Sequence, residues 1–252
     1  MKKRFGALML ALVLAFSLAI PAGAAVIEES TMPVVELPDE VLDNLTAVDY
    51  ANAYTDLKDI IHSTELSQFE KDQIAIQKYI AIYTDKMNTP AATAEYPYDY
   101  LPTSESVLCD AEKALVKQNP LQASSVYSCA LTANKNTISK YGAGSHNDNG
   151  DAFRHMLWSA LMTKEFSLFG SDLSNGRAVA KKWGDAHEEM PGNPPLEKSM
   201  DLKNNAVGRN LLTTSMNTTA KIVDACIAKV KNGGGYRIVN NALVSTNSTG
   251  LK

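Results

Sequence analysis

The sequence predicts a mainly α-helical protein, a helical bundle that ends in one short strand or β-hairpin. Two observations favour this class. Apolar residues recur at helical spacing through most of the chain, and short breaks rich in Pro, Gly and Asn separate the helical stretches. Only YRIVNNALVST, near the C-terminus, has the composition of strands, with Asn240-Asn241 at the position of a turn.

Residues 1–24 have the three parts of a secretory signal peptide. A basic start (MKKR) precedes a continuous apolar run, which ends in Ala22-Gly23-Ala24. A membrane anchor is the alternative, because the run is not far short of the roughly 20 residues that a span needs. The small-residue ending favours cleavage after Ala24. We therefore expect a secreted or cell-envelope-associated protein, without a membrane span after cleavage and with a loosely ordered leader over 25–38.

Charge and cysteine content exclude some classes of protein. Removing the signal takes the formal charge from -4 to -7, because three positive charges leave with it. We expect no nucleic-acid partner, since phosphate backbones are bound by basic patches. Cys109 and Cys129 are spaced like two arms of a helical hairpin, so either a disulfide or free thiols fit the sequence. With no C-x-x-C, a structural zinc site is not expected.

Two helices are predicted between residues 39 and 86, and they form an N-terminal helical hairpin. The first covers about 39–61, where apolar residues recur at helical spacing. Ser67 and Glu70 form a capping box for the second. Residues 87–102 contain three prolines and three tyrosines without an apolar period. They read as a linker, or as an aromatic segment laid over the following domain.

Residues 103–252 are predicted to form a C-terminal helical domain. Thr103 or Ser104 caps a helix over about 105–118, and a partner helix over 121–141 is closed by Gly142. Three helices follow, the first at about Asp151 and the others after the caps Ser174 and Asn193-Pro194. A last amphipathic helix covers 218–231, and the final residues STGLK should fray.

Three blocks of these helices place polar residues on apolar faces: HNDNGDAFRHMLW, WGDAHEE and MDLKNNAVGR. At 100° per residue, Asp151 and His155 share one stripe with Trp158. His187 lies at the edge of a core face, and Asp201 shares a stripe with an amide one turn away. Burying such groups costs kilocalories per mole unless they find partners. We therefore predict that the three regions meet in one cavity.

The polar residues suit a hydrolase, and two versions of its site stay open. In the first, His155, His187 and Asp201 hold a divalent metal; zinc suits such N/O ligands with one open position. In the second, a histidine oriented by an aspartate acts as general base without a metal. The catalytic candidates are His155, His187, Glu188 and Asp201. The candidates for substrate binding are Arg154, Asn204, Asn205 and Arg209.

The competing interpretation is a non-catalytic secreted binding or scaffold domain, in which the polar cluster is a structural hydrogen-bond network. Known catalytic and calcium motifs do not decide between the two. The spacing H-E-x-x-H is absent, G-x-S-x-G occurs nowhere, and an EF-hand is excluded because Ala152 stands where its glycine is required.

The blocks GDAFRHMLWSALMT, GDAHE, GNPP and MDLKNNAVGR, in this order, resemble a bacterial domain of unknown function found in exported and wall-associated proteins. The resemblance covers about residues 147–210, and the part before Thr103 lies outside it. It implies an all-helical domain in an envelope or extracellular setting, and it implies no particular reaction. Our working hypothesis is a hydrolase, with or without a divalent metal, that acts on a cell-envelope or extracellular substrate.

Overall fold

The computed structural model describes residues 34–89, 108–167 and 172–252. The predicted signal peptide, most of the leader and of the linker, and the predicted caps Thr103 and Ser104 lie outside these ranges. The helix expected from about residue 105 begins only at Asp110, because residues 108 and 109 are not helical and Cys109 is its N-cap. Residues 35–252 group as one compact unit. The mainly α fold is confirmed, and a two-stranded hairpin follows the helices. The division into a hairpin domain and a C-terminal domain stays a prediction.

The first predicted helix is in fact two helices, α2 (Asp39–Asn44) and α3 (Ala47–His62). The chain is extended at residues 45 and 46, where Thr46 and Asp49 form a capping box that starts α3. The apolar spacing continues across this break, so periodicity alone concealed it. Helix α4 (Gln68–Asn88) begins with the predicted capping box of Ser67 and Glu70.

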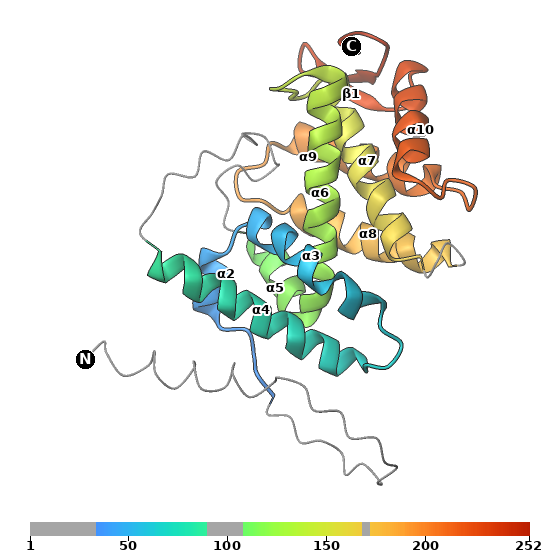
Figure 1. The fold of residues 1–252 in the computed structure, drawn as a ribbon. Helices are drawn as coiled ribbons and strands as arrows, with labels where there is room; N and C mark the ends of the chain where they lie inside the picture. The colour runs from blue at the N-terminus through green and yellow to red at the C-terminus, as the bar shows by residue number, and fades with distance from the viewer. Residues whose placement is uncertain (1–33, 90–107, 168–171) are drawn as a thin grey trace. The chain divides into compact units, whose positions relative to one another are not determined.

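Helices α5 (Asp110–Gln118) and α6 (Pro120–Tyr141) meet at Asn119, and Gly142 ends α6 as predicted. Helix α6 contacts α3, α4 and α5, and it also contacts α7 (Asn149–Glu165). The long α6 therefore links the N-terminal helices to the helices that carry the three polar blocks (Figure 1).

Helix α7 is buried along most of its length. It packs against α6, α8 (Leu173–His187), α9 (Pro195–Leu211) and α10 (Thr219–Lys231). Gly208 of α9 lets two backbones approach closely, since an added Cβ would lie 2.0 Å from the carbonyl oxygen of Met156. Polar groups on α7 thus enter an interior that four other helices enclose.

The predicted caps of α8 and α9 were also wrong. Asp172, rather than Ser174, caps α8, because its carboxylate accepts hydrogen bonds from two backbone amides of the first turn. Helix α9 begins with Pro194 as its N-cap and without a side-chain cap, as a helix that opens on proline can. Asn193 instead turns toward Glu188, to which its amide donates at 3.1 Å.

The C-terminal hairpin is confirmed: β1 (Tyr236–Val239) pairs antiparallel with β2 (Ala242–Ser245). Asn240 and Asn241 at the turn both have positive φ, as a two-residue hairpin turn of this kind requires. The final residues do not fray, because the amide of Lys252 donates to the carbonyl of Lys140 at 2.8 Å.

The three cysteines are free thiols, so the Cys109–Cys129 bridge does not form in this structure. Among residues 34–89, 108–167 and 172–252, none of the helices combines the length and hydropathy needed to cross a bilayer.

Candidate functional site

The first half of the site lies on α7, where Asp151 and His155 are one turn apart and buried. Asp151 Oδ1 accepts a hydrogen bond from Arg154 Nη2 at 2.5 Å and lies 3.4 Å from His155 Nε2. Its Oδ2 accepts from the Asn147 amide at 2.5 Å. Burial alone would raise the pKa of Asp151, but Arg154 and His155 attract its charge and hold that pKa well below its usual range.

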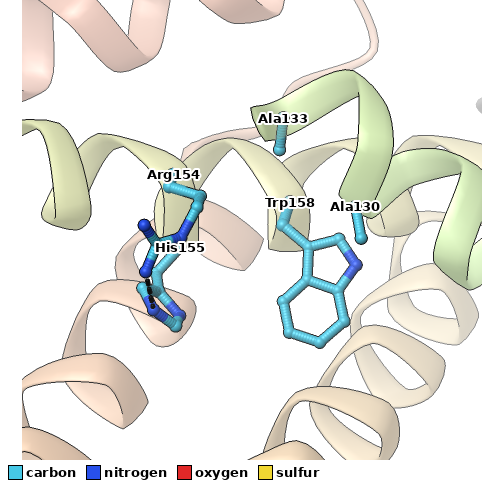
Figure 2. Close-up of a pocket in the computed structure, with 5 residues that line it drawn as sticks. All are labelled: Ala130, Ala133, Arg154, His155 and Trp158. Atoms are coloured by element: carbon cyan, nitrogen blue, oxygen red, sulfur yellow. Dashed lines mark hydrogen bonds between the residues drawn. The ribbon is translucent and has the colours of Figure 1, made fainter. Parts of the chain in front are cut away.

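Figure 2 shows Arg154 and His155 side by side on α7, joined by the contact between Arg154 Nη2 and His155 Nε2. Trp158, one turn further along, turns toward Ala130 and Ala133 of α6. Because these two alanines are small, α6 comes close to the face of α7 that carries the site.

The other carboxylates come from α8 and α9. Asp201 of α9 places Oδ1 3.3 Å from His155 Nε2, and Glu188, just after α8, places Oε1 3.7 Å from His155 Nδ1. Burial alone would lower the pKa of His155, but the attraction of Asp201, Asp151 and Glu188 outweighs it and raises this pKa to about 9. Burial and the neighbouring carboxylates raise the pKa of Asp201 to about 7, against the attraction of His155.

Two atoms at the centre of this cluster are buried without a hydrogen bond. In the part of the chain that the structure describes, neither His155 Nδ1 nor Asp201 Oδ1 has a hydrogen-bond partner. The residues themselves are only 3% and 9% exposed. Leaving a buried polar group without a hydrogen bond lowers the stability of a protein by about 1–3 kcal/mol. Such atoms in a native structure are therefore candidates for binding a water molecule or an ion.

The geometry of three of these side chains suits a metal ion. One ligand atom from each of Asp151, His155 and Asp201 can be chosen so that all three lie within 4.8 Å of one another. The two separations from His155 Nε2, 3.4 and 3.3 Å, are close to the roughly 3.3 Å between ligands of a tetrahedral zinc ion bound at 2.0–2.1 Å.

A cavity of about 330 Å³ adjoins these residues. Its lining comes from all three polar blocks and from the loop between α8 and α9: His146, Asp151, Arg154, His155, His187, Glu188, Met190, Pro191, Gly192, Asn193 and Asp201. The volume is within the usual range for small-molecule sites. The regions near residues 155, 187 and 201 therefore do meet in one cavity.

His187 lines this cavity but is not part of the metal-like triplet. Its Nδ1 lies 3.1 Å from Glu112 Oε1 of α5, and its ring packs edge-on against Trp158 at 5.3 Å. Burial alone would lower the pKa of His187, but Glu112 outweighs burial and raises it. The predicted ligand set is His155, His187 and Asp201; the geometry favours a set in which Asp151 takes the place of His187.

Three of the predicted substrate contacts point elsewhere. Asn204 donates to the carbonyl of Tyr236 and accepts from its amide, both at 2.9 Å, and so fastens β1 to α9. Asn205 accepts from Ser159 and donates to Glu188 at 3.3 Å. Neither asparagine lines the cavity, and nor does Arg209, so none of the three is placed to contact a substrate there.

Arg154 does line the cavity, but its guanidinium is already engaged. Besides the bond to Asp151, its Nη1 donates to the carbonyl of Ser145 at 3.1 Å. Its position fits an orienting role toward Asp151 better than a free contact to substrate.

Sequence reasoning missed two residues of the site. Glu112 belongs to no polar block, and its only local signal is the spacing Cys109-x-x-Glu112 of a capping box. His146 lines the cavity, is exposed, and places Nε2 3.6 Å from Glu197 Oε2. Its signal was its place as the first residue of the block HNDNGDAFRHMLW.

Comparisons with known proteins identify a domain but no activity. No solved structure matches the chain. The matching family is described as a domain of unknown function, DUF6973, and its model covers residues 113–234, from within α5 to just before β1. This range includes the metal-like triplet and His187, and it leaves Glu112 just outside. Over residues 113–234 the chain is thus similar to the uncharacterised domain family DUF6973, and the resemblance inferred from the sequence blocks is confirmed there.

Proposed function

We propose that the chain is an exported, metal-dependent hydrolase that binds one divalent cation through Asp151, His155 and Asp201 and acts on a cell-envelope or extracellular substrate. The observation that carries the proposal is the triplet itself. Three ligand atoms from two helices lie within 4.8 Å of one another at the wall of a cavity, and one of them, Asp201 Oδ1, has no hydrogen-bond partner among the described residues.

The local charge supports a divalent ion. When all three are ionised, Asp151, Asp201 and Glu188 carry three negative charges, while Arg154 carries one positive charge. With a neutral imidazole at His155, two negative charges are left in a buried site, and one divalent cation balances them. Without a metal, a proton on His155 offsets one of these two charges, and Asp201, Asp151 and Glu188 raise the pKa of His155 to about 9.

Glu188 has the position of a residue that orients a metal-binding histidine. A histidine that binds metal through one nitrogen usually donates its other N–H to a carboxylate. Here Nε2 faces the two aspartates, and Nδ1 faces Glu188 at 3.7 Å, slightly beyond hydrogen-bond reach. Asn193 and Asn205 each donate to Glu188 and hold it beside the ring.

Hydrolysis is the reaction class that this arrangement supports best. The mixed oxygen and nitrogen ligands suit zinc and similar divalent ions, which lower the pKa of a bound water to about 7. Three protein ligands leave a coordination position for that water, and the cavity offers space for a substrate. The export of the protein is inferred from residues 1–24 and sets the compartment of the substrate.

Metal binding by matched variants tests the proposal. Wild-type protein is stripped with chelator, and the binding of Zn²⁺ and Mn²⁺ is measured by calorimetry and elemental analysis. We expect about one ion per chain, and tight binding should be lost in Asp201→Asn and His155→Gln because each removes a ligand. Asp185→Asn is the control, since Asp185 of α8 is partly exposed and pairs with Lys181.

Activity is measured on a panel of chromogenic esters, phosphodiesters, amides and glycosides, with and without chelator. Turnover that chelator abolishes and the metal restores is the expected result. The proposal is wrong if wild type binds no ion, or if Asp201→Asn binds it as tightly as Asp185→Asn does. Loss of stability in the site variants without turnover by wild type would favour the scaffold interpretation.

A further inference from the structure

A second pair of ionisable groups, Glu112 of α5 and His187 of α8, takes no part in the proposed metal site. Both residues are buried, at 1% and 7% exposed. His187 Nδ1 lies 3.1 Å from Glu112 Oε1. His187 also lines the cavity, so its ring contacts Glu112 and also borders the space beside the triplet.

The Glu112 carboxylate is fixed by its other contacts. Its Oε2 accepts from the backbone amide of Cys109 at 3.1 Å, which ties it to the first turn of α5. Its Oε1 accepts from the Tyr127 hydroxyl of α6 at 3.1 Å, in addition to its contact with His187. With partners on the backbone and on a second helix, the carboxylate cannot rotate away from the imidazole without losing these bonds.

This arrangement sets the tautomer of His187. Burial alone would raise the pKa of Glu112, but His187 and the surrounding hydrogen bonds outweigh burial and lower it, so the carboxylate is ionised. An ionised carboxylate only accepts hydrogen bonds, so Nδ1 of His187 must carry the hydrogen. Nε2 then has a free lone pair in the neutral ring, and no hydrogen bond to Nε2 exists among the described residues.

We propose that Glu112 positions His187 as the proton-transfer residue of the cavity, with Nε2 as the reacting nitrogen. The inference rests on the proposed hydrolase function and assigns a step of it. Trp158, packed edge-on against the imidazole at 5.3 Å and 85°, keeps the ring in the plane that Glu112 selects. The pair has the arrangement of a histidine oriented by a carboxylate in general acid–base catalysis.

The proposed step is balanced with water as the co-reactant. A water beside the scissile bond gives a proton to Nε2 while its oxygen bonds to the electrophilic carbon or phosphorus of the substrate. Glu112 stabilises the imidazolium that forms. The imidazolium then gives this proton to the leaving group as the scissile bond breaks, and the neutral ring is restored.

The first test needs no substrate and reads the tautomer directly. In protein labelled with ¹⁵N-histidine, the nitrogen shifts of neutral His187 show which nitrogen carries hydrogen, and His187→Gln identifies the signal. We expect the hydrogen on Nδ1 in wild type. In Glu112→Gln the amide oxygen must still accept from the Cys109 amide, so the NH₂ group faces His187 and donates to Nδ1. The hydrogen should therefore move to Nε2.

The control for this test is Glu189→Gln, which changes an exposed glutamate near the end of α8 that pairs with Lys198. It should leave the tautomer as in wild type. A wild-type hydrogen on Nε2, or an unchanged tautomer in Glu112→Gln, overturns the positioning role of Glu112. A buried glutamate with a merely structural role would change stability without moving this hydrogen.

The second test measures turnover and metal content on the same chromogenic panel. Glu112→Gln and His187→Gln should each lower kcat by about a hundredfold or more, with KM and bound metal unchanged. Turnover that survives both changes refutes the proton-transfer role while it leaves the metal-dependent hydrolase standing. Loss of the metal in His187→Gln would instead make His187 a ligand and refute this inference. If wild type hydrolyses no substrate of the panel, the hydrolase proposal and the proton-transfer step both fail. The tautomer experiment then still tests whether Glu112 orients His187.

Discussion

Binding of a divalent ion at Asp151, His155 and Asp201 should depend steeply on pH, because the ion and a proton compete for His155. The pKa of His155 is raised to about 9 by Asp201, Asp151 and Glu188, which outweigh burial. At neutral pH the ring is therefore protonated in the metal-free protein. The metal needs the unprotonated nitrogen, so binding must release that proton.

The size of the pH effect on metal affinity follows from this competition between the ion and the proton. Below a pKa of about 9, each unit of pH lowers the unprotonated fraction of His155 tenfold, which corresponds to about 1.4 kcal/mol of binding free energy. Between pH 8 and pH 6 the apparent affinity should therefore fall about a hundredfold, or about 2.7 kcal/mol. Asp201, whose pKa is raised to about 7, also takes up a proton over this interval and steepens the fall.

Calorimetry in buffers with different heats of ionisation checks both the slope and the number of protons. We expect about one proton released per Zn²⁺ at pH 8, and a weaker affinity at each lower pH. Asp185→Asn, which changes no ligand, should show the wild-type slope. Tight binding that is flat between pH 8 and pH 6 and releases no proton would show that His155 is not a ligand.

Three further predictions concern packing around the site. Gly208→Ala would place a Cβ 2.0 Å from the carbonyl oxygen of Met156, so the crossing of α7 and α9 must open, at a cost of about 3 kcal/mol or more in chemical denaturation. Asn204→Ala removes both bonds to the backbone of Tyr236; we expect a loss of about 2 kcal/mol and faster hydrogen exchange at that amide. Tyr50→Phe removes a buried hydroxyl that has no hydrogen-bond partner among the described residues. The free energy of unfolding should therefore stay unchanged or rise by up to about 1 kcal/mol, and the melting temperature should not fall.

Local signals explain which parts of the fold the sequence predicted well. The capping box at Ser67 and Glu70, the glycine that ends α6 and the Asn240-Asn241 turn each act within a few residues, and the structure contains all three. The break between α2 and α3 was missed, although Thr46 and Asp49 have capping-box spacing, because the apolar period runs through it. Where a capping box and an apolar period conflict, as they do here, the period alone does not show where a helix ends.

The site was predictable as a cluster, but its grouping was not. A buried histidine or carboxylate on an apolar face needs a partner, so the meeting of residues near 155, 187 and 201 followed from the cost of burying them alone. Which of these side chains could bind the same metal ion depends on how far each helix is rotated about its axis, and that rotation is set by helix packing. Gly208 brings α9 against α7, and Asp201 thereby reaches the stripe of Asp151 and His155.

The role of His187 depends on a contact that no local pattern encodes. Its partner Glu112 is 75 positions earlier in the chain, on a helix that ends before the polar blocks begin. The sequence alone shows no partner for His187 and therefore places it among the predicted metal ligands. Once Glu112 holds its Nδ1, the ring has only Nε2 left for the cavity, and Asp151 is the side chain beside His155 that can complete the triplet. In our proposals, this single long-range pairing assigns two histidines that look equivalent in sequence to different roles, His155 as a ligand and His187 as a proton carrier, and the tautomer and metal-content experiments test that distinction.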